Sequence, residues 1–239
     1  HPMLRLLYVL IIKILGKKVI LTIHGNIGRF GKLYNWFDKL SIKLNDCSIL
    51  INKLSYHKAK EWNSNVCYLS AYISPIEDGY LPLYVIDKIN KKKIDGKTII
   101  VTNAYKRAFN FEGEEIYGID FLIRFCKKHK NLFLIISDPS KQYYDLYKNE
   151  QFENVEIVVE PHSFYCLLKY ADWMIRATAT DGDALSIREA LSLRKCVFAT
   201  NRVDRPCGCI LFEYNNELSL ERVIKQVGDI NIDLLVDNE

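Results

Sequence analysis

The sequence predicts an α/β protein in which parallel sheets are covered by helices on both faces, in two Rossmann-like domains. Short apolar runs alternate along the chain with segments whose apolar positions recur at helical spacing. Alternating strands and helices produce parallel strands joined by helical crossovers, and these helices cover the sheet. The alternation occurs twice, with an irregular stretch between the two runs. Two domains are therefore expected.

Residues 1–75 are predicted to form a partial N-terminal domain. An amphipathic segment at 3–15 opens it, and we expect this helix to pack on a sheet or to lie on a membrane surface. Three strands are few for a doubly wound domain, so we expect its opening strands to be absent from this chain. The other elements expected here are strands at 19–23, 48–51 and 66–69 and helices at 32–44 and 55–62, the second helix capped by Ser55.

Residues 76–95 are predicted to be a linker. The stretch breaks the alternation, with Gly79, Pro82 and the cationic run Lys91-Lys92-Lys93. The alternation then restarts, which places a complete C-terminal Rossmann-like domain at 96–239. Its expected strands are 98–102, 132–137, 155–159, 172–176 and 195–200, and its expected helices are 118–129, 141–147, 164–170, one opening near Asp183, and 217–227.

The composition fits a soluble globular protein, with 49% hydrophobic and 26% charged residues. Residues 1–95 hold 15 Lys and Arg against 7 Asp and Glu, whereas residues 96–239 hold 18 against 22. The basic first part suggests an anionic partner, such as a membrane surface or a charged ligand, or an ordinary solvated face. The seven scattered cysteines suggest thiols in a reducing compartment, and Cys207-Gly208-Cys209 lacks the second pair that a zinc site needs.

Ligands in open parallel sheets bind beyond the carboxyl ends of the strands. One such loop is His24-Gly25-Asn26-Ile27-Gly28-Arg29, and His24 could bind a polar ligand, act as an acid or base, or simply bond to backbone. Further loops begin at Asn103, at Asp138-Pro139 and at Thr178.

The loop beginning at Thr178 leads into Asp181-Gly182-Asp183-Ala184-Leu185-Ser186, which we expect to open a helix. The amides at 183–186 could bind phosphate oxygens, and Glu189 could accept hydrogen bonds from ribose hydroxyls. In the loop after Asn103, Lys106 and Arg107 could neutralise phosphate charge. Each of these residues also has a purely structural interpretation. Asp181 and Asp183 could cap the helix, Lys106 and Arg107 could be solvated loop charges, and Glu189 could be a surface residue of the helix. Together they suit a nucleoside diphosphate.

Several enzyme classes lack their motifs in this chain. There is no Gly-x-Ser-x-Gly elbow, no phosphate loop ending in Gly-Lys-Ser/Thr and no His-Glu-x-x-His. These absences argue against a serine hydrolase of that fold, a P-loop NTPase and a zincin. Aromatic residues are not interleaved with a basic sheet face, so no nucleic-acid partner is expected.

Three segments together resemble the donor-binding region of glycosyltransferase family 4, the group 1 glycosyltransferases. They are residues 171–176, residues 180–191 with Asp181 and Glu189 separated by seven residues, and residues 195–200. The strand before His24-Gly25 also resembles a strand of the family's N-terminal domain. The resemblance implies the GT-B fold of two Rossmann-like domains and a sugar transfer from a nucleotide-sugar donor.

The resemblance also implies roles for single residues. Glu189 matches the glutamate that holds the donor ribose, and Asp181 matches the acidic residue that faces the donor sugar. His24 matches the histidine near the reaction centre. Residues 182–185 match the loop beside the sugar and phosphates, and Lys106 or Arg107 matches the family's arginine after the first C-domain strand. The implied catalytic residues are thus His24 and Asp181. Together with the loops and the helix start described above, the expected nucleotide-binding residues are Asn103, Lys106, Arg107, Gly182, Asp183, Ala184, Leu185, Ser186 and Glu189.

The chain departs from the family pattern at several positions. Asp181 is shorter than the usual Glu, Arg194 replaces a Gly, and Cys196 replaces the usual Pro. Tyr117-Gly118 stands where the family has its phosphate Lys before Gly, so the phosphate charge must be met by Lys106, Arg107 or another cation. The first Gly-rich loop of the N-terminal domain is not visible.

The expected function is therefore that of a hexosyltransferase that uses a UDP- or GDP-linked sugar donor and no metal or other cofactor. The resemblance implies a retaining reaction on a glycan or lipid-linked acceptor, in bacterial polysaccharide or glycolipid synthesis. The expected location is cytoplasmic, at the inner face of the membrane, with a peripheral contact through the basic N-terminal part. Two alternatives remain open: a sugar-nucleotide epimerase on the same fold, and a truncated nucleotide-binding module without activity.

Overall fold

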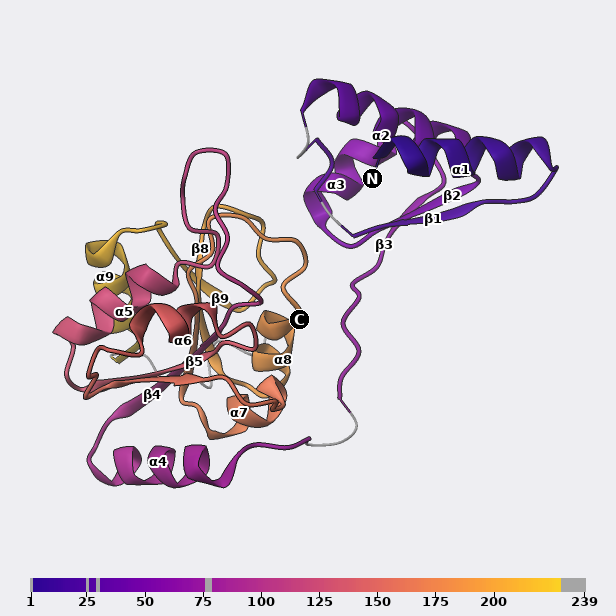
Figure 1. The fold of residues 1–239 in the computed structure, drawn as a ribbon. Coiled ribbons are helices and arrows are strands. Elements are labelled where there is room, and N and C mark those ends of the chain that lie inside the picture. The colour runs from indigo at the N-terminus through magenta and orange to yellow at the C-terminus, as the bar shows by residue number, and fades with distance from the viewer. Residues whose placement is uncertain (1, 25, 29–30, 76–78, 229–239) are drawn as a thin grey trace. The chain divides into compact units, whose positions relative to one another are not determined.

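The computed structural model describes residues 2–24, 26–28, 31–75 and 79–228. They form two units that divide between Ala71 and Tyr72. Each unit contains a parallel sheet with helices (Figure 1).

The first unit has a three-stranded parallel sheet in the order β1-β2-β3. Ile23, Ile42, Leu50 and Ala59 form its buried core, where the sheet meets α2 and α3. Helix α3 is capped by Asn52, whose Oδ1 accepts a hydrogen bond from the Ser55 amide at 2.8 Å, so the predicted cap at Ser55 is wrong. The elements are α1 (Pro2–Ile14), β1 (Ile20–Ile23), α2 (Lys32–Leu44), β2 (Cys47–Leu50), α3 (Lys53–Lys60) and β3 (Val66–Tyr68).

Helix α1 packs chiefly against α2 rather than on a sheet. Leu6 and Val9 are buried, and the two charged residues of the helix pair with acids of the same unit. Arg5 bonds to Asp38 at 2.8 Å, and Lys13 bonds to Asp46 at 2.8 Å. The rest of the helix surface is apolar and exposed, at Met3, Leu4, Leu7, Tyr8, Leu10, Ile11 and Ile14.

The second unit has six parallel strands in the order β6-β5-β4-β7-β8-β9. Numbered within the unit, this is 3-2-1-4-5-6, the order of a doubly wound Rossmann sheet. The strands are β4 (Thr98–Asn103), β5 (Leu132–Ser137), β6 (Val155–Val158), β7 (Trp173–Arg176), β8 (Cys196–Thr200) and β9 (Cys209–Phe212). The helices are α4 (Leu83–Ile94), α5 (Ile119–Lys128), α6 (Gln142–Tyr147), α7 (Phe164–Tyr170), α8 (Leu185–Ser192) and α9 (Glu217–Gly228).

The core of the second unit has two layers because successive strand residues point to opposite faces of the sheet. Ile100 packs toward α5 and α9, whereas Ile99 and Val101 pack toward α4, α7 and α8. Figure 1 shows these two groups of helices on opposite sides of the sheet. Most strand residues are apolar, as expected for a sheet covered on both faces, and polar side chains lie mainly at the strand ends.

The prediction of a linker over 76–95 is wrong for its larger part. Residues 83–94 form helix α4, and Val85 and Ile89 are buried in the core of the second unit. Val85 and Ile89 lie one helical turn apart, as in an amphipathic helix. The cationic run Lys91-Lys92-Lys93 follows them directly and makes this helical spacing hard to recognise in the sequence. Strand β9 was also not predicted; its short apolar run follows directly on Cys207-Gly208.

Candidate functional site

The strand order places a topological switch point between β4 and β7. From this point, the chain runs from β4 toward β5 on one side and from β7 toward β8 on the other. In sheets of this order, ligands bind beyond the carboxyl ends of the two strands at the switch point. Asn103 ends β4 and Arg176 ends β7. Nη1 of Arg176 donates to both the carbonyl oxygen and Oδ1 of Asn103, each at 2.9 Å, and so bridges the two strands.

Asp181 lies in the same cluster, in the turn after β7. Its Oδ2 accepts a hydrogen bond from Nε of Arg176 at 2.9 Å and lies 3.2 Å from Nη1 of Arg205. Burial alone would raise the pKa of Asp181, but the guanidinium groups of Arg176 and Arg205 hold it below its usual range. Asp181 is therefore ionised at neutral pH, with its carboxylate held by two cations.

Arg205 was not among the residues predicted from the sequence. It lies in the loop between β8 and β9, and its side chain is only 2% exposed. Nη2 donates to Thr178 Oγ1 at 2.7 Å and to Thr200 Oγ1 at 3.0 Å, while Nε donates to the Thr200 carbonyl at 3.1 Å. Arg205 thus joins the ends of β7 and β8 to the acidic turn.

The acidic turn leads into α8, which begins at Leu185 rather than near Asp183. Asp183 bonds to Nε of Arg188 at 2.6 Å, and the amide of Gly182 donates to Asp181 Oδ1 at 3.1 Å. The Gly182 amide therefore already has an acceptor. Leu185 and Ser186 are the first two residues of the helix, so their amides have no acceptor within it.

Glu189 lies one turn further along α8 and is half-buried. Burial raises the pKa of its carboxyl group. Among the residues that the structure describes, no hydrogen-bond or ion-pair partner is recorded for this carboxylate. It is the carboxylate of the acidic segment that is available to a ligand, since those of Asp181 and Asp183 bind arginines.

The two predicted cations of the β4–α5 loop have different surroundings. Lys106 is exposed. Arg107 pairs with Asp120 at 3.0 Å, and its guanidinium lies over the Phe109 ring, 4.8 Å from the centroid. The hydrogen bond to Asp120 raises the pKa of Arg107. The charge of Arg107 is therefore already matched by a carboxylate.

The start of α5 is also occupied by a group of the protein. Oε1 of Glu115 accepts hydrogen bonds from the Ile119 amide at 2.9 Å and the Tyr143 hydroxyl at 2.6 Å, and Oε2 accepts from the Asp120 amide at 2.9 Å. Although these bonds lower it, burial raises the pKa of Glu115 overall. The first amides of α5 are thus already satisfied by a carboxyl group.

Tyr117 and Gly118, which replace the Lys-Gly pair of the resembling family, pack on the end of β7. The Arg176 guanidinium lies 5.3 Å from the centroid of the Tyr117 ring. Gly118 has φ +65°, and a Cβ on it would lie 2.2 Å from the Ala177 carbonyl oxygen. Gly118 therefore lets the loop approach the backbone at the switch point.

His24 belongs to the first unit, where it follows β1 and is exposed. Gly25 and Arg29 of the same predicted loop lie outside the described residues. In the described part of the chain, no three His, Cys, Asp or Glu side chains are grouped so that they could hold a metal ion.

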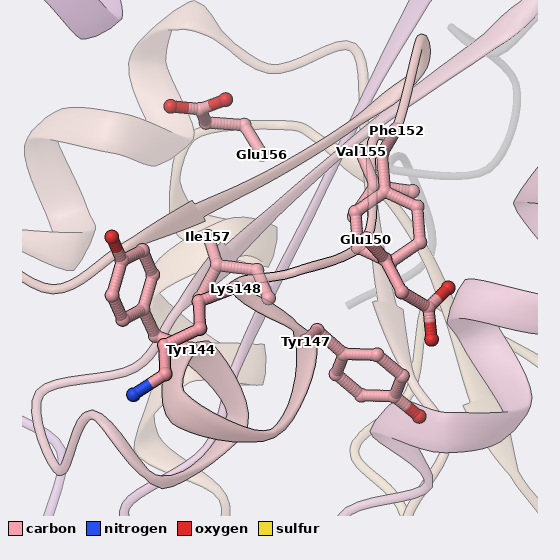
Figure 2. Close-up of a pocket in the computed structure, with 8 residues that line it drawn as sticks. All are labelled: Tyr144, Tyr147, Lys148, Glu150, Phe152, Val155, Glu156 and Ile157. Atoms are coloured by element: carbon pink, nitrogen blue, oxygen red, sulfur yellow. The ribbon is translucent and has the colours of Figure 1, made fainter.

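A pocket of about 220 Å³ lies at one edge of the large sheet, beside the edge strand β6. Its lining includes Tyr144 and Tyr147 of α6 and Glu156 and Ile157 of β6 (Figure 2). None of its lining residues belongs to the cluster at the switch point.

No protein-family model matches the chain. No curated protein matches it either. Solved structures do match its fold. Anabaena HepE in complex with UDP and glucose has a TM-score of 0.71 at 10% identity, with 99% of this chain and 69% of HepE covered.

Two further structures match over most of this chain. A UDP-forming α,α-trehalose-phosphate synthase from Burkholderia xenovorans has a TM-score of 0.71 at 8% identity, over 97% of this chain and 65% of that one. A point mutant of S. aureus TarM, in complex with fondaparinux, α-GlcNAc-glycerol and UDP, has a TM-score of 0.63 at 14% identity, over 92% of this chain and 45% of TarM. This chain thus spans between about half and two thirds of these proteins. The similarity concerns the fold, and the chain has the α/β architecture of the GT-B fold.

Proposed function

We propose that the chain is part of a glycosyltransferase that moves a sugar from a nucleotide-sugar donor to an acceptor hydroxyl. The observation that carries the proposal is Glu189, a half-buried carboxylate without a recorded partner among the described residues, on the helix that starts at the switch point. Carboxylates bind ribose hydroxyls in Rossmann-type sites, and the family 4 resemblance assigns this role to Glu189. The matching structures of HepE and TarM contain UDP, which supports UDP as the first nucleotide to test.

In the proposed complex, the Leu185 and Ser186 amides bind the diphosphate at the start of α8. Glu189 holds the ribose. The family 4 resemblance further assigns roles at the donor sugar to His24 and to Asp181, whose carboxylate is held by Arg176 and Arg205. The bond between the anomeric carbon and the diphosphate oxygen breaks, and the acceptor oxygen bonds to that carbon. The proton of the acceptor hydroxyl passes to the departing diphosphate oxygen. The rate enhancement comes from positioning the donor and stabilising the leaving diphosphate, without a metal ion.

The finer parts of the proposal follow from the family 4 resemblance. We propose that the reaction retains the anomeric configuration, and that it serves bacterial polysaccharide or glycolipid synthesis at the cytoplasmic face of the membrane. A sugar-nucleotide epimerase would need additional acid and base carboxylates. Asp181 and Asp183 are each paired with an arginine, which favours the transferase.

Calorimetric titration with UDP and GDP, followed by a donor screen with product analysis, tests the proposal. We expect one nucleotide to bind and the matching nucleotide-sugar to lose its sugar to an acceptor. Absence of binding by both nucleotides would contradict the transferase. Binding without sugar release or transfer would indicate a nucleotide-binding module, and conversion of the free nucleotide-sugar to an isomer would indicate an epimerase.

The same protein is proposed to contact an anionic membrane through α1. None of the helices in the described ranges has both the length and the apolar character needed to cross a bilayer. The exposed side of α1 is nonetheless apolar, with Leu7 51% and Ile11 45% exposed. Residues 1–71 contain 11 Lys and Arg against 3 Asp and Glu. An apolar helix face within a basic unit fits an anionic lipid surface.

Vesicle co-sedimentation tests this contact. The protein is expected to bind vesicles containing phosphatidylglycerol more strongly than vesicles of phosphatidylcholine alone. The double substitution Leu7→Asn and Ile11→Asn should weaken binding by about tenfold or more, because it removes two apolar side chains from the contact. Leu54→Asn on α3, which is 68% exposed, is the control and should bind as the unmodified chain does. Equal binding by the double variant would contradict the proposal.

A further inference from the structure

The cluster at the switch point contains more positive than negative charge. The side chains of Arg176 and Arg205 are 8% and 2% exposed, and both pair with Asp181. Their other recorded partners are neutral: Asn103 and the Tyr117 ring for Arg176, and Thr178 and Thr200 for Arg205. Within the described part of the chain, two buried guanidinium groups therefore share one carboxylate.

An unmatched buried charge is costly, because the protein interior solvates it less well than water. Burial lowers the pKa of Arg205, and the nearby Arg176 acts in the same direction. A ligand anion would offset this cost. The cluster lies beside the turn that leads into α8, where the Leu185 and Ser186 amides also favour an anion.

The other expected sources of positive charge are less suitable. Arg107 is already paired with Asp120, and Glu115 already satisfies the first amides of α5. The family's phosphate lysine is Tyr117 in this chain. Lys106 of the same loop is exposed, so water solvates its charge. The surplus of buried positive charge near the switch point thus comes from β7 and from the β8–β9 loop.

We propose that Arg176 and Arg205 supply the positive charge that stabilises the donor diphosphate at the start of α8, in place of the missing lysine. This inference rests on the proposed nucleotide-sugar function and assigns its phosphate charge to two residues. Because both side chains are almost fully buried, they act as positioning residues. They hold the acidic turn through Asp181 and raise the electrostatic potential where the diphosphate binds.

The test compares a nucleotide with its nucleoside. The unmodified chain and the variants Arg205→Met and Arg205→Lys are titrated with UDP and with uridine, or with GDP and guanosine if GDP is the nucleotide that binds. Arg205→Met should weaken UDP binding by about tenfold or more and change uridine binding by less than about twofold, because uridine has no phosphates. Arg205→Lys retains the charge and should retain most of the UDP affinity.

A purely structural role gives a different result. If Arg205→Met only disordered the turn, it would weaken UDP and uridine binding by the same factor, and that outcome would overturn the inference, as would unchanged UDP binding. Arg222→Met removes an exposed cation from α9 and is the control for net charge. Should Arg205→Met fail to fold, Arg176→Met makes the same test, since either variant leaves one arginine paired with Asp181.

The result also separates this inference from the proposed function. If the unmodified chain binds none of the four ligands, the proposed function fails. If it binds UDP and uridine, but the ratio of the two affinities in each methionine variant equals the ratio in the unmodified chain, only the assignment of the phosphate charge fails.

Discussion

Replacing Gly118 with alanine is expected to lower the free energy of unfolding by about 3 kcal/mol or more, because positive-φ strain and a steric clash add together. The new Cβ would lie 2.2 Å from the Ala177 carbonyl oxygen and 2.8 Å from the Ala177 Cβ. Both atoms belong to the chain at the end of β7, so neither a rotamer change nor a small side-chain movement relieves the contact. Urea unfolding, with the midpoint and the slope both fitted, measures the change.

Gly113→Ala is the matched control because it lies in the same β4–α5 loop. Gly113 has φ +76°, close to the +65° of Gly118, but a Cβ on it meets nothing within 4 Å. It should therefore show only the backbone strain, about 1 kcal/mol. Equal destabilisation by the two substitutions would mean that the close approach to Ala177 is unimportant. We also expect Gly118→Ala to weaken nucleotide binding, since displacement of this loop moves Tyr117 away from Arg176.

The parts of the fold that could be predicted from sequence are those with a local periodic signal. The strand at 132–137 and the helices at 32–44 and 164–170 have the predicted bounds because each is an apolar or amphipathic run between clear breaks. Helix α4 was missed because the contacts of Val85 and Ile89 with the large sheet decide its place, while its own sequence is dominated by lysines.

The same distinction explains the candidate site. Glu189 could be predicted, because only a short loop and the start of one helix separate it from Asp181, so the two positions are related by local sequence. Arg205 could not, because it reaches Asp181 across 24 residues of sequence, and an arginine in a loop has no periodic signal. The pairing of Asp181 with Arg176 and Arg205 could not be predicted from the sequence either. Sequence spacing predicted which backbone segments meet, whereas the ion pairs depend on side-chain geometry across three strand ends.

Glu189→Gln is expected to weaken nucleoside and nucleotide binding alike, by about ten- to a hundredfold, because hydrogen bonds from ribose hydroxyls to a carboxylate are lost or weakened. Uridine and UDP should be affected by the same factor, in contrast to the arginine variants, because the ribose is common to both. Calorimetry measures the affinities. Glu153→Gln, at a side chain that is 82% exposed before β6, is the control and should leave both affinities unchanged.

The fold should tolerate this substitution. Burial raises the pKa of Glu189 in the folded chain, so the protonated group favours folding at low pH, and this contribution is lost as the pH rises through the raised pKa. At neutral pH the ionised carboxylate therefore costs stability, and Glu189→Gln should unfold at the same or a slightly higher urea concentration. A large loss of stability would instead assign Glu189 a structural role.

The pH dependence of uridine binding follows from the same ionisation. Ribose binding needs the ionised carboxylate, so affinity should fall as the pH drops through the raised pKa of Glu189, at a higher pH than for an ordinary glutamate. Uridine is the suitable probe because its ribose is present while the phosphate, which itself titrates near pH 6, is absent. The Glu189→Gln chain should show no such fall. A pH profile shared by both proteins would assign the titration to another group and remove Glu189 from the ribose site.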